Sequence, residues 1–389
     1  MSNQGATERA RIWASTMGGH GRPLEGGGDF RTAHHDSHAT IGEVSAYARP
    51  ERDAGHHLPL TEGATRGDGS GDRVVEEAPD QFRTCFERDR DRILHSTTFR
   101  RLAGKTQVFV FPEDHQRSRL THALEVAQVS RAIAARLGLN VALTEAIALG
   151  HDCGHGPGGH ASEDALSPYV DGGYDHAQWG ADVTLAPLNL CVQTLDGIRN
   201  HSWSRPAPDT PEGEVVSWAD RIAYVCHDFE DAAHAGIVNA NDLPSGVVQR
   251  CGTTRREQLA TFIDGVVSAS TTSGHIGMDS DTAETLADFR SFDYERIYLR
   301  PESLKQAGRV IDLLRALVDH FVANPEDLPP GAIDDIGGGS ERGDMASSPV
   351  MIHAAVCYVG GMTDRFACRS GLSLLGWAPR QLPDGLGLT

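Results

Sequence analysis

The sequence predicts a mainly α-helical protein, and two patterns along the chain lead to that prediction. From about residue 80 onward, apolar residues recur at the three- and four-residue spacing of amphipathic helices. Strand-like character is confined to one candidate, TQVFVF at residues 106–111, and the sequence contains no internal repeat. The helical pattern is strongest over residues 118–137, 141–152, 211–234 and 301–322, and a short apolar helix is expected near 350–359.

Residues that cap helices stand at the ends of these segments. Gly138 follows the first segment, and glycine readily takes the left-handed conformation of a C-terminal cap. Pro211 suits the first turn of its helix, because an N–H at that position would have no partner within the helix. Asp209 and Glu212 have the three-residue spacing of a capping box. These residues support the predicted boundaries.

The first 75 residues differ in composition from the rest of the chain. They are rich in Gly, His, Asp, Arg and Thr and have hardly any apolar periodicity. Such a segment cannot bury enough surface to offset the entropy lost on ordering. We therefore expect a disordered or loosely attached leader over residues 1–75, one main domain over 76–378 and a C-terminal tail over 379–389.

Composition limits the classes of partner. The chain has 389 residues, of which 39% are hydrophobic, enough for a substantial core, and its formal net charge is −19. We do not expect so acidic a protein to bind nucleic acid or an anionic membrane through a broad basic surface. The seven cysteines form no C-x-x-C pair, and the sequence has neither an apolar signal segment nor an apolar run of about 18 residues. We therefore expect a cytoplasmic protein.

Residues 145–164, EAIALGHDCGHGPGGHASED, combine histidines, glycines and acidic residues, which raises the question of a nucleotide loop. Residues 154–159 match G-x-G-x-x-G, but the dinucleotide-binding motif follows a strand, whereas the preceding residues have helical spacing. Pro157 also interrupts the match. GKT at residues 104–106 lacks the upstream glycine of a phosphate-binding P-loop, because Phe99 stands there. We reject both nucleotide motifs.

A metal site explains the same stretch better. His151 and Asp152 are adjacent at a predicted helix end, and imidazole and carboxylate are suitable ligands for Mn, Fe, Ni or Mg. His155 follows four residues after His151, and the surrounding glycines would let the backbone approach a ligand closely. The alternative is a surface His–Asp pair that closes a helix.

Two other predicted helices carry polar residues among apolar ones. His122 lies among leucines, valines and an isoleucine, with Arg119 three residues earlier; a histidine in such a place is otherwise a core residue with its hydrogen bonds satisfied. The second predicted helix carries one stripe of polar residues. On the alternative interpretation, this stripe has no function and simply faces solvent. If the stripe faces inward, its carboxylates need a cation or hydrogen-bond donors. The stripe consists of Asp220, Tyr224, His227 and Asp228.

The order H…HD…D resembles that of HD-domain phosphohydrolases, and longer stretches resemble the deoxyguanosine triphosphate triphosphohydrolases and their relatives. The Arg-x-x-His extension of the motif, Arg119 and His122, makes the second resemblance specific. It implies an HD-domain helical bundle with additional C-terminal helices. The matching stretches are ILHSTTFRRLAGKTQVF, RSRLTHALEVAQVSR, EAIALGHDCGHGPGGHASE, GGYDHAQWG, VVSWADRIAYVCHDFEDA and GMTDRFA, which together span residues from about 90 to 367.

The resemblance also implies a function and a set of site residues. The expected reaction is metal-dependent hydrolysis of deoxynucleoside triphosphates to deoxynucleoside and triphosphate, with Mg, Mn, Fe or Ni as the divalent metal. The implied metal ligands are His122, His151, Asp152 and Asp220. The implied catalytic residues are His160 as proton donor, Glu163 as its orienting partner, and His155. The implied substrate contacts are Arg119, His155 and His176 to phosphate, Tyr224 under the sugar, and Asp228 and Gln107 to the 3′-hydroxyl. Arg101, Lys105 and Arg221 are weaker phosphate candidates.

Two other functions stay open from the sequence. One is an HD phosphohydrolase with a different leaving group, such as a 5′-nucleotidase or an alarmone hydrolase. The other is a non-catalytic module that senses nucleotides or binds single strands, which the acidic charge and the full ligand set argue against. The partners expected are a dNTP substrate and further copies of the chain. A dNTP activator is a further candidate, and no membrane partner is expected.

Overall fold

The structure, a computed structural model, describes residues 48–53, 59–112, 115–332 and 349–385, together with the backbone of two short strands. The chain divides into two compact units, residues 1–47 and 48–389. In the first unit, β1 (His20–Pro23) pairs antiparallel with β2 (Asp29–Thr32). The rest of the expected leader up to residue 47 lies outside the described residues.

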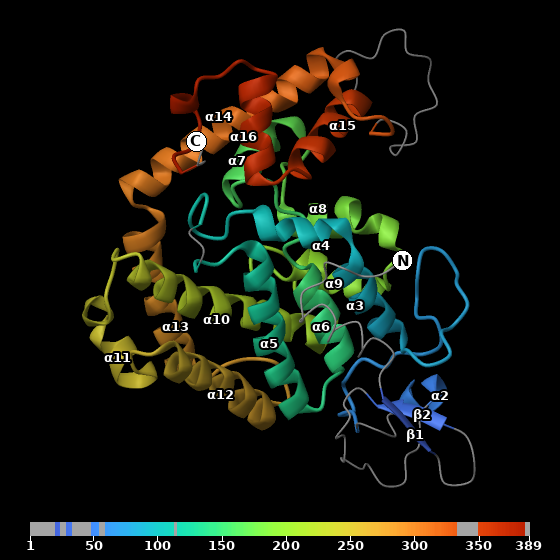
Figure 1. Cartoon of the computed structure of the whole chain (residues 1–389). Coiled ribbons are helices and arrows are strands. Elements are labelled where there is room, and N and C mark those ends of the chain that lie inside the picture. The colour runs from blue at the N-terminus through green and yellow to red at the C-terminus, as the bar shows by residue number, and fades with distance from the viewer. Residues whose placement is uncertain are drawn as a thin grey trace. The chain divides into compact units, whose positions relative to one another are not determined.

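The second unit is helical, which confirms the predicted mainly α class (Figure 1). The candidate strand at 106–111 is wrong: these residues form a series of bends after one isolated bridge, between Thr106 and Ser118. Short 3-10 or π turns connect several of the helices. The α-helices are α2 (Arg49–Asp53), α3 (Cys85–His95), α4 (Thr97–Arg101), α5 (Arg119–Leu137), α6 (Val141–Gly150), α7 (Ala161–Leu166), α8 (His176–Trp179), α9 (Val192–Asn200), α10 (Pro211–His234), α11 (Ser245–Cys251), α12 (Arg255–Ser273), α13 (Ser280–Asp293), α14 (Pro301–Ala323), α15 (Pro349–Gly360) and α16 (Asp364–Ser373).

Two hydrophobic cores hold these helices together. In the larger core α5 packs against α6, α10 and α12, and buried Ile133, Ile147 and Ile222 belong to it. In the smaller core α14 packs against α7, α15 and α16, around Leu314 and Met351. Figure 1 shows α7, α14, α15 and α16 grouped together, apart from α5, α10 and α12. The segment between α6 and α7, which contains the His- and Gly-rich stretch, connects the two groups.

The helix ends agree with the sequence in part. Gly138 caps α5 in the left-handed conformation with φ of 66°, as expected. At the start of α10 the capping box is wrong, because Thr210 rather than Asp209 is the cap and accepts a hydrogen bond from Gly213 N at 3.1 Å. Glu212 is fully buried and instead accepts from the backbone N–H groups of Thr65 and Asn140.

Within the expected leader, the described residues 59–75 make polar contacts with the helical unit. Arg73 Nη1 lies 2.6 Å from Asp89 Oδ1 on α3, and the exposed fractions of the two side chains are 1% and 0%. The Thr61 N–H donates to the carbonyl of Gly138, and the Thr65 hydroxyl donates to Glu212 Oε2. These polar contacts attach the segment to α3, α5 and α10. Apolar periodicity cannot reveal an attachment made by polar groups.

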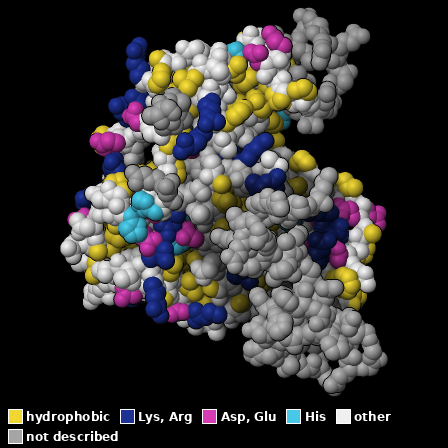
Figure 2. Space-filling model, viewed as in Figure 1, with side chains coloured by type: hydrophobic (Ala, Val, Ile, Leu, Met, Phe, Trp, Pro, Cys, Tyr) yellow, Lys and Arg dark blue, Asp and Glu magenta, His cyan; other side chains and the backbone are white. Residues whose placement is uncertain are grey.

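The surface is mixed in character. Figure 2 shows acidic, basic and hydrophobic side chains interspersed over the face in view, so the negative charge is not gathered into one patch there. Among the described residues, no helix is both long enough and apolar enough to cross a membrane.

Candidate metal centre

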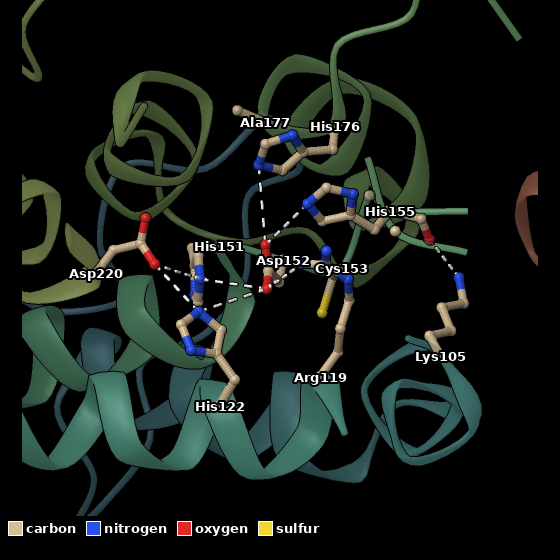
Figure 3. A network of polar contacts seen from close by, with 12 residues as sticks. Lys105, Arg119, His122, His151, Asp152, Cys153, His155, His176, Ala177 and Asp220 are labelled. Carbon is tan, nitrogen blue, oxygen red and sulfur yellow. Dashed lines mark hydrogen bonds and ion pairs between the residues drawn. The ribbon is translucent and has the colours of Figure 1, made fainter. Parts of the chain in front are cut away.

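Four residues from three separate segments bring their ligand atoms together, as Figure 3 shows. His122 comes from α5, His151 and Asp152 from the end of α6, and Asp220 from α10. Nε2 of His122 lies 3.1 Å from Asp220 Oδ1 and 3.8 Å from Asp152 Oδ2. Nε2 of His151 lies 3.6 Å and 3.5 Å from the same two oxygens. The four residues predicted as metal ligands thus meet at one point.

The helices explain why these side chains converge. His122 is buried on the face of α5 that packs against α6 and α10, so it points between the helices and not into solvent. α6 ends at Gly150, and His151 and Asp152 form the turn that follows. Gly154 lets this turn approach α8, because a Cβ there would lie 2.0 Å from the carbonyl oxygen of His176.

The arrangement of His151 fits a bound divalent cation. Its Nδ1 lies 2.6 Å from the carbonyl oxygen of Ala148, which can only accept, so Nδ1 carries the proton of the neutral ring. The lone pair of Nε2 then faces the carboxylates of Asp152 and Asp220, which is unfavourable unless a positive charge lies between them. Burial opposes charge on the ring, yet these two carboxylates raise the pKa of His151 to about 9. Two imidazoles and two carboxylates suit a first-row divalent metal, and a carbonyl that orients a ligand ring is usual at such sites.

Asp152 connects this site to a second group of side chains. Its Oδ2 accepts a hydrogen bond from Arg119 Nη1 at 2.7 Å, while Oδ1 lies 3.1 Å from His155 Nε2 and 3.8 Å from His176 Nε2. Burial raises the pKa of Asp152, but Arg119, His151 and His155 outweigh it and hold that pKa well below its usual range. Asp152 is therefore ionised, with a different set of partners at each oxygen (Figure 3).

Three of the predicted phosphate and proton-transfer residues form a cluster of rings. The rings of His155 and His176 are stacked, with centroids 3.7 Å apart and an angle of 14° between planes. His160 is exposed and meets both rings edge-on, at 5.0 Å and 5.9 Å between centroids. The structure thus brings His155, His160 and His176 together beside Asp152.

Glu163 has a partner that was not expected. Its Oε1 lies 2.5 Å from His176 Nδ1 and also accepts from the backbone N–H of His176 at 2.9 Å. Two nitrogens of His176, at the start of α8, therefore contact the same carboxylate oxygen. The hydrogen bond to His176 was not predicted, because spacing within one helix turn cannot reveal a partner from another segment. The expected role of Glu163 as orienting partner of His160 stays a prediction.

His201 belongs to the same region and was not predicted. It is buried after the end of α9, its Nε2 lies 3.3 Å from His176 Nε2, and its ring lies 5.0 Å from that of His151. Its Nδ1 contacts the carbonyl oxygen of Ile198 at 2.8 Å, three residues earlier. The signal in the sequence is that His201, like His151, directly follows a helix.

Arg119 keeps hydrogen-bonding capacity for a ligand. Its side chain is buried, and its Nε and Nη2 atoms have no acceptor among the described residues. A Cβ at Gly159 would lie 2.6 Å from Nη2, so the glycine leaves room for the guanidinium beside the loop that precedes His160. A buried guanidinium with unused donors is suited to an anionic group such as phosphate.

The residues predicted to contact the sugar follow Asp220 along α10. Tyr224 is half-buried, and its hydroxyl accepts from Arg290 Nε at 2.8 Å. Asp228 Oδ2 accepts from the hydroxyl of Tyr298 at 2.5 Å, while Oδ1 has no hydrogen-bond partner among the described residues. Burial raises the pKa of Asp228 to about 7. The Oε1 atom of Gln107 is also buried and without a partner in the described part of the chain.

The three weaker phosphate candidates each have partners within the protein. Arg101 is exposed and donates to the carbonyl of Gly361 at 3.2 Å. Lys105 is buried, and its Nζ donates to the carbonyls of His155 and Gly360; burial lowers its pKa to about 8. The Arg221 guanidinium lies 3.5 Å from the centre of the Trp203 ring. Lys105 thereby holds the loop that carries His155.

Comparison with known families agrees with this geometry. Residues 119–225 match the HD domain, and residues 276–371 match the phosphohydrolase-associated domain. The first match contains all four residues of the candidate metal centre. The chain is therefore a phosphohydrolase of the HD-domain class.

Curated relatives identify the family within that class. A relative from Caldanaerobacter subterraneus subsp. tengcongensis is 37% identical over 78% of this chain and 88% of its own length. One from Clostridium perfringens is 37% identical over 79% and 92%, and one from Roseobacter denitrificans is 33% identical over 78% and 94%. All three are named deoxyguanosinetriphosphate triphosphohydrolase-like protein. The chain belongs to this family.

Proposed function

We propose that the protein hydrolyses deoxynucleoside triphosphates to deoxynucleoside and intact triphosphate. The oxygen of water would join the α-phosphorus, the bond from that phosphorus to the 5′ oxygen would break, and the 5′ oxygen would leave with a proton. The observation that carries the proposal is the position of Asp152, with one oxygen toward the metal ligands and the other toward His155 and His176. A cation site next to basic side chains suits a triphosphate in an otherwise acidic protein.

His122, His151, Asp152 and Asp220 would hold the divalent cation. When bound, such a cation lowers the pKa of water toward neutrality and draws charge from a phosphoryl oxygen. The protein's own contribution is to fix the ligands, through the Ala148 carbonyl at His151 and the Arg119 guanidinium at Asp152.

Arg119 would bind the α-phosphate through its unused Nε and Nη2 donors. The phosphate chain would then extend over the stacked rings of His155 and His176, with Glu163 fixing the orientation of His176. His160, the exposed ring of the cluster, would donate the proton that the leaving 5′ oxygen needs. In this proposal Glu163 would orient His176 and would also act on His160, whose charge interacts with that of Glu163.

The deoxyribose would lie along α10, against Tyr224 and Asp228. The Tyr224 ring would occupy the space beside C2′ and leave no room for a 2′-hydroxyl. Asp228 Oδ1 and Gln107 Oε1, which are both buried without partners in the described chain, would accept from the 3′-hydroxyl.

The proposal is tested by incubating the metal-loaded protein with each dNTP and each rNTP and separating the products by anion exchange. We expect tripolyphosphate and deoxynucleoside from dNTPs, and loss of turnover in Asp220→Ala with the fold retained. Orthophosphate or pyrophosphate as the first product would instead indicate another HD phosphohydrolase. Binding without turnover, despite full metal occupancy, would favour a sensing module.

A further inference from the structure

Asp364 is the first residue of α16, yet its carboxylate contacts two segments outside that helix. Its Oδ2 accepts from the Thr106 hydroxyl at 2.6 Å, and its Oδ1 accepts from the Gly158 N–H at 2.9 Å. The exposed fraction of Asp364 is 6%. An acidic residue in the first turn commonly interacts with the N–H groups of its own helix, but here Thr363 is the cap and accepts from Phe366 N. The buried carboxylate of Asp364 therefore connects three distant parts of the chain.

Both contacted segments carry residues of the proposed active site. Thr106 directly precedes Gln107, whose buried Oε1 is assigned to the 3′-hydroxyl. Gly158 lies two residues before His160, the assigned proton donor. Gly158 has φ of 74°, and a Cβ there would lie 2.5 Å from a methyl carbon of Val310 on α14. The loop before His160 therefore packs closely on the C-terminal helices and is also hydrogen-bonded to them.

Lys105 makes a second connection between the same regions. Its buried Nζ donates to the carbonyl oxygen of His155, which begins the loop, and at 3.0 Å to that of Gly360, which ends α15. Figure 3 shows Lys105 reaching the backbone beside His155. Buried polar groups at the ends of α15 and α16 thus hold both the loop and the segment that carries Gln107.

We propose that Asp364 is a positioning residue that holds the loop of His160 and the segment of Gln107 in place relative to each other. The carboxylate would act through these two residues and would not touch the substrate. The inference rests on the proposed function, which gives His160 and Gln107 their roles, and it assigns the C-terminal helices a part in the reaction. A displacement of about 1 Å at the reacting groups can lower a rate about a hundredfold, so this contact should matter for turnover.

The test uses Asp364→Ala in the full-length, Mn²⁺-loaded protein, with dGTP and 2′,3′-dideoxy-GTP as substrates. The ratio of kcat/KM for the two substrates does not depend on how much of the protein is folded. We expect kcat for dGTP to fall roughly ten- to hundredfold with bound Mn²⁺ per chain unchanged. The ratio of dGTP over dideoxy-GTP should fall roughly two- to tenfold, as for the loss of one hydrogen bond to the 3′-hydroxyl. Hydrogen exchange at residues 155–160 should become faster, because the Gly158 N–H loses its acceptor.

Three further variants separate positioning from stability. Asp364→Asn should keep the ratio and the slow exchange, because its carbonyl can accept from the Gly158 N–H while its amide donates to the Thr106 oxygen. Thr106→Val should lower the ratio without faster exchange, and it tests the inference even if Asp364→Ala does not fold. Leu317→Ala is the control, since it weakens the core of the same C-terminal helices and should lower the melting temperature with no change in the ratio.

Unchanged exchange at residues 155–160 in Asp364→Ala would overturn the inference, and so would a wild-type ratio in both Asp364→Ala and Thr106→Val. If the wild type released no tripolyphosphate from any dNTP, the proposed function would fail alone. The exchange rates would then still decide whether Asp364 holds the loop, because they are measured without nucleotide.

Discussion

Arg119 donates from Nη1 to Asp152 Oδ2 at 2.7 Å, and the exposed fractions of the two side chains are 2% and 4%. This ion pair joins the group proposed to bind the α-phosphate to a proposed metal ligand. Because the pair is buried, the energetic consequences of changing either partner are large. Because the two partners are assigned to different ligands, a variant of Arg119 that keeps the positive charge can test phosphate binding separately from metal binding.

Arg119→Lys is expected to keep the metal and lose phosphate binding. Lysine retains the positive charge beside Asp152 but cannot offer the forked donors of a guanidinium. A hydrogen bond to a charged group contributes about 1.5–3 kcal/mol, so kcat/KM for dGTP should fall roughly ten- to hundredfold. Arg136→Lys is the control, since Arg136 lies on the same helix in an exposed pair with Asp264. Unchanged kcat/KM in Arg119→Lys would show that the α-phosphate binds elsewhere.

Tyr224 is expected to control the choice between deoxyribose and ribose. Tyr224→Ala should raise the relative rate on rNTPs and lower that on dNTPs, because it removes the ring that excludes a 2′-hydroxyl. A buried hydroxyl without a partner costs about 1–3 kcal/mol, so the ratio of kcat/KM for dGTP over GTP should fall roughly ten- to hundredfold. Tyr224→Phe is the control, since it keeps the ring and loses only the contact with Arg290. An equal ratio in Tyr224→Ala and wild type would move the sugar away from α10.

Asp228→Ala should weaken dNTP hydrolysis without relaxing the choice of sugar, because Asp228 is assigned to the 3′-hydroxyl. The measurement is kcat/KM for dGTP and GTP in the same series. A selective gain on GTP would instead connect Asp228 with the 2′ position.

The pKa of Asp228 predicts a dependence of stability on pH. Its pKa is raised from 3.8 to about 7, so between these values the folded protein binds more protons at this carboxyl than the unfolded chain does. The stability that it contributes is therefore present at low pH and lost as pH rises to about 7. Asp228→Asn cannot ionise, and it should gain up to about 1.4 kcal/mol per pH unit relative to wild type over this interval. Urea unfolding at pH 4.5, 6 and 7.5 measures the difference, which should level off above pH 7. A pH-independent difference would contradict the raised pKa.

Two truncations test where the domain begins. Removal of residues 1–47 takes away a separate unit of low apolar content and should leave the melting temperature and turnover nearly unchanged. Removal of residues 1–75 also takes Arg73 from the buried carboxylate of Asp89. Breaking a buried ion pair costs about 3–5 kcal/mol, so this truncation should melt much earlier. Arg73→Ala in the full chain should reproduce most of the loss. Equal melting temperatures for the two truncations would show that residues 59–75 contribute no stability.

The long helices could be predicted because their signal is local. α10 covers residues 211–234 as expected, and α5 ends at Leu137 with Gly138 as its cap, as expected, since the apolar period and the capping residues lie in or next to the helix itself. The four proposed metal ligands could be named from the HD pattern. That pattern fixes residue types at positions where three helices must meet, and the structure brings them together.

The rest depends on contacts between distant segments. Glu163 is hydrogen-bonded to His176, and Arg73 is attached through Asp89, so neither relation can be read from spacing. His201 was missed because its neighbours His151 and His176 come from other elements. A histidine directly after a helix end is a weak signal that becomes meaningful only beside another ligand.

The measurement that tests the central claim most directly is hydrolysis of dGTP in H₂¹⁸O, with mass spectrometry of both products. Attack of water on the α-phosphorus puts one ¹⁸O on the terminal phosphoryl group of tripolyphosphate and none in deoxyguanosine. We predict that distribution for the metal-loaded protein and no labelled product for Asp220→Ala. Label in deoxyguanosine would show cleavage on the carbon side of the 5′ oxygen. Label in released orthophosphate or pyrophosphate would show attack at another phosphorus, and either result would contradict the proposed reaction.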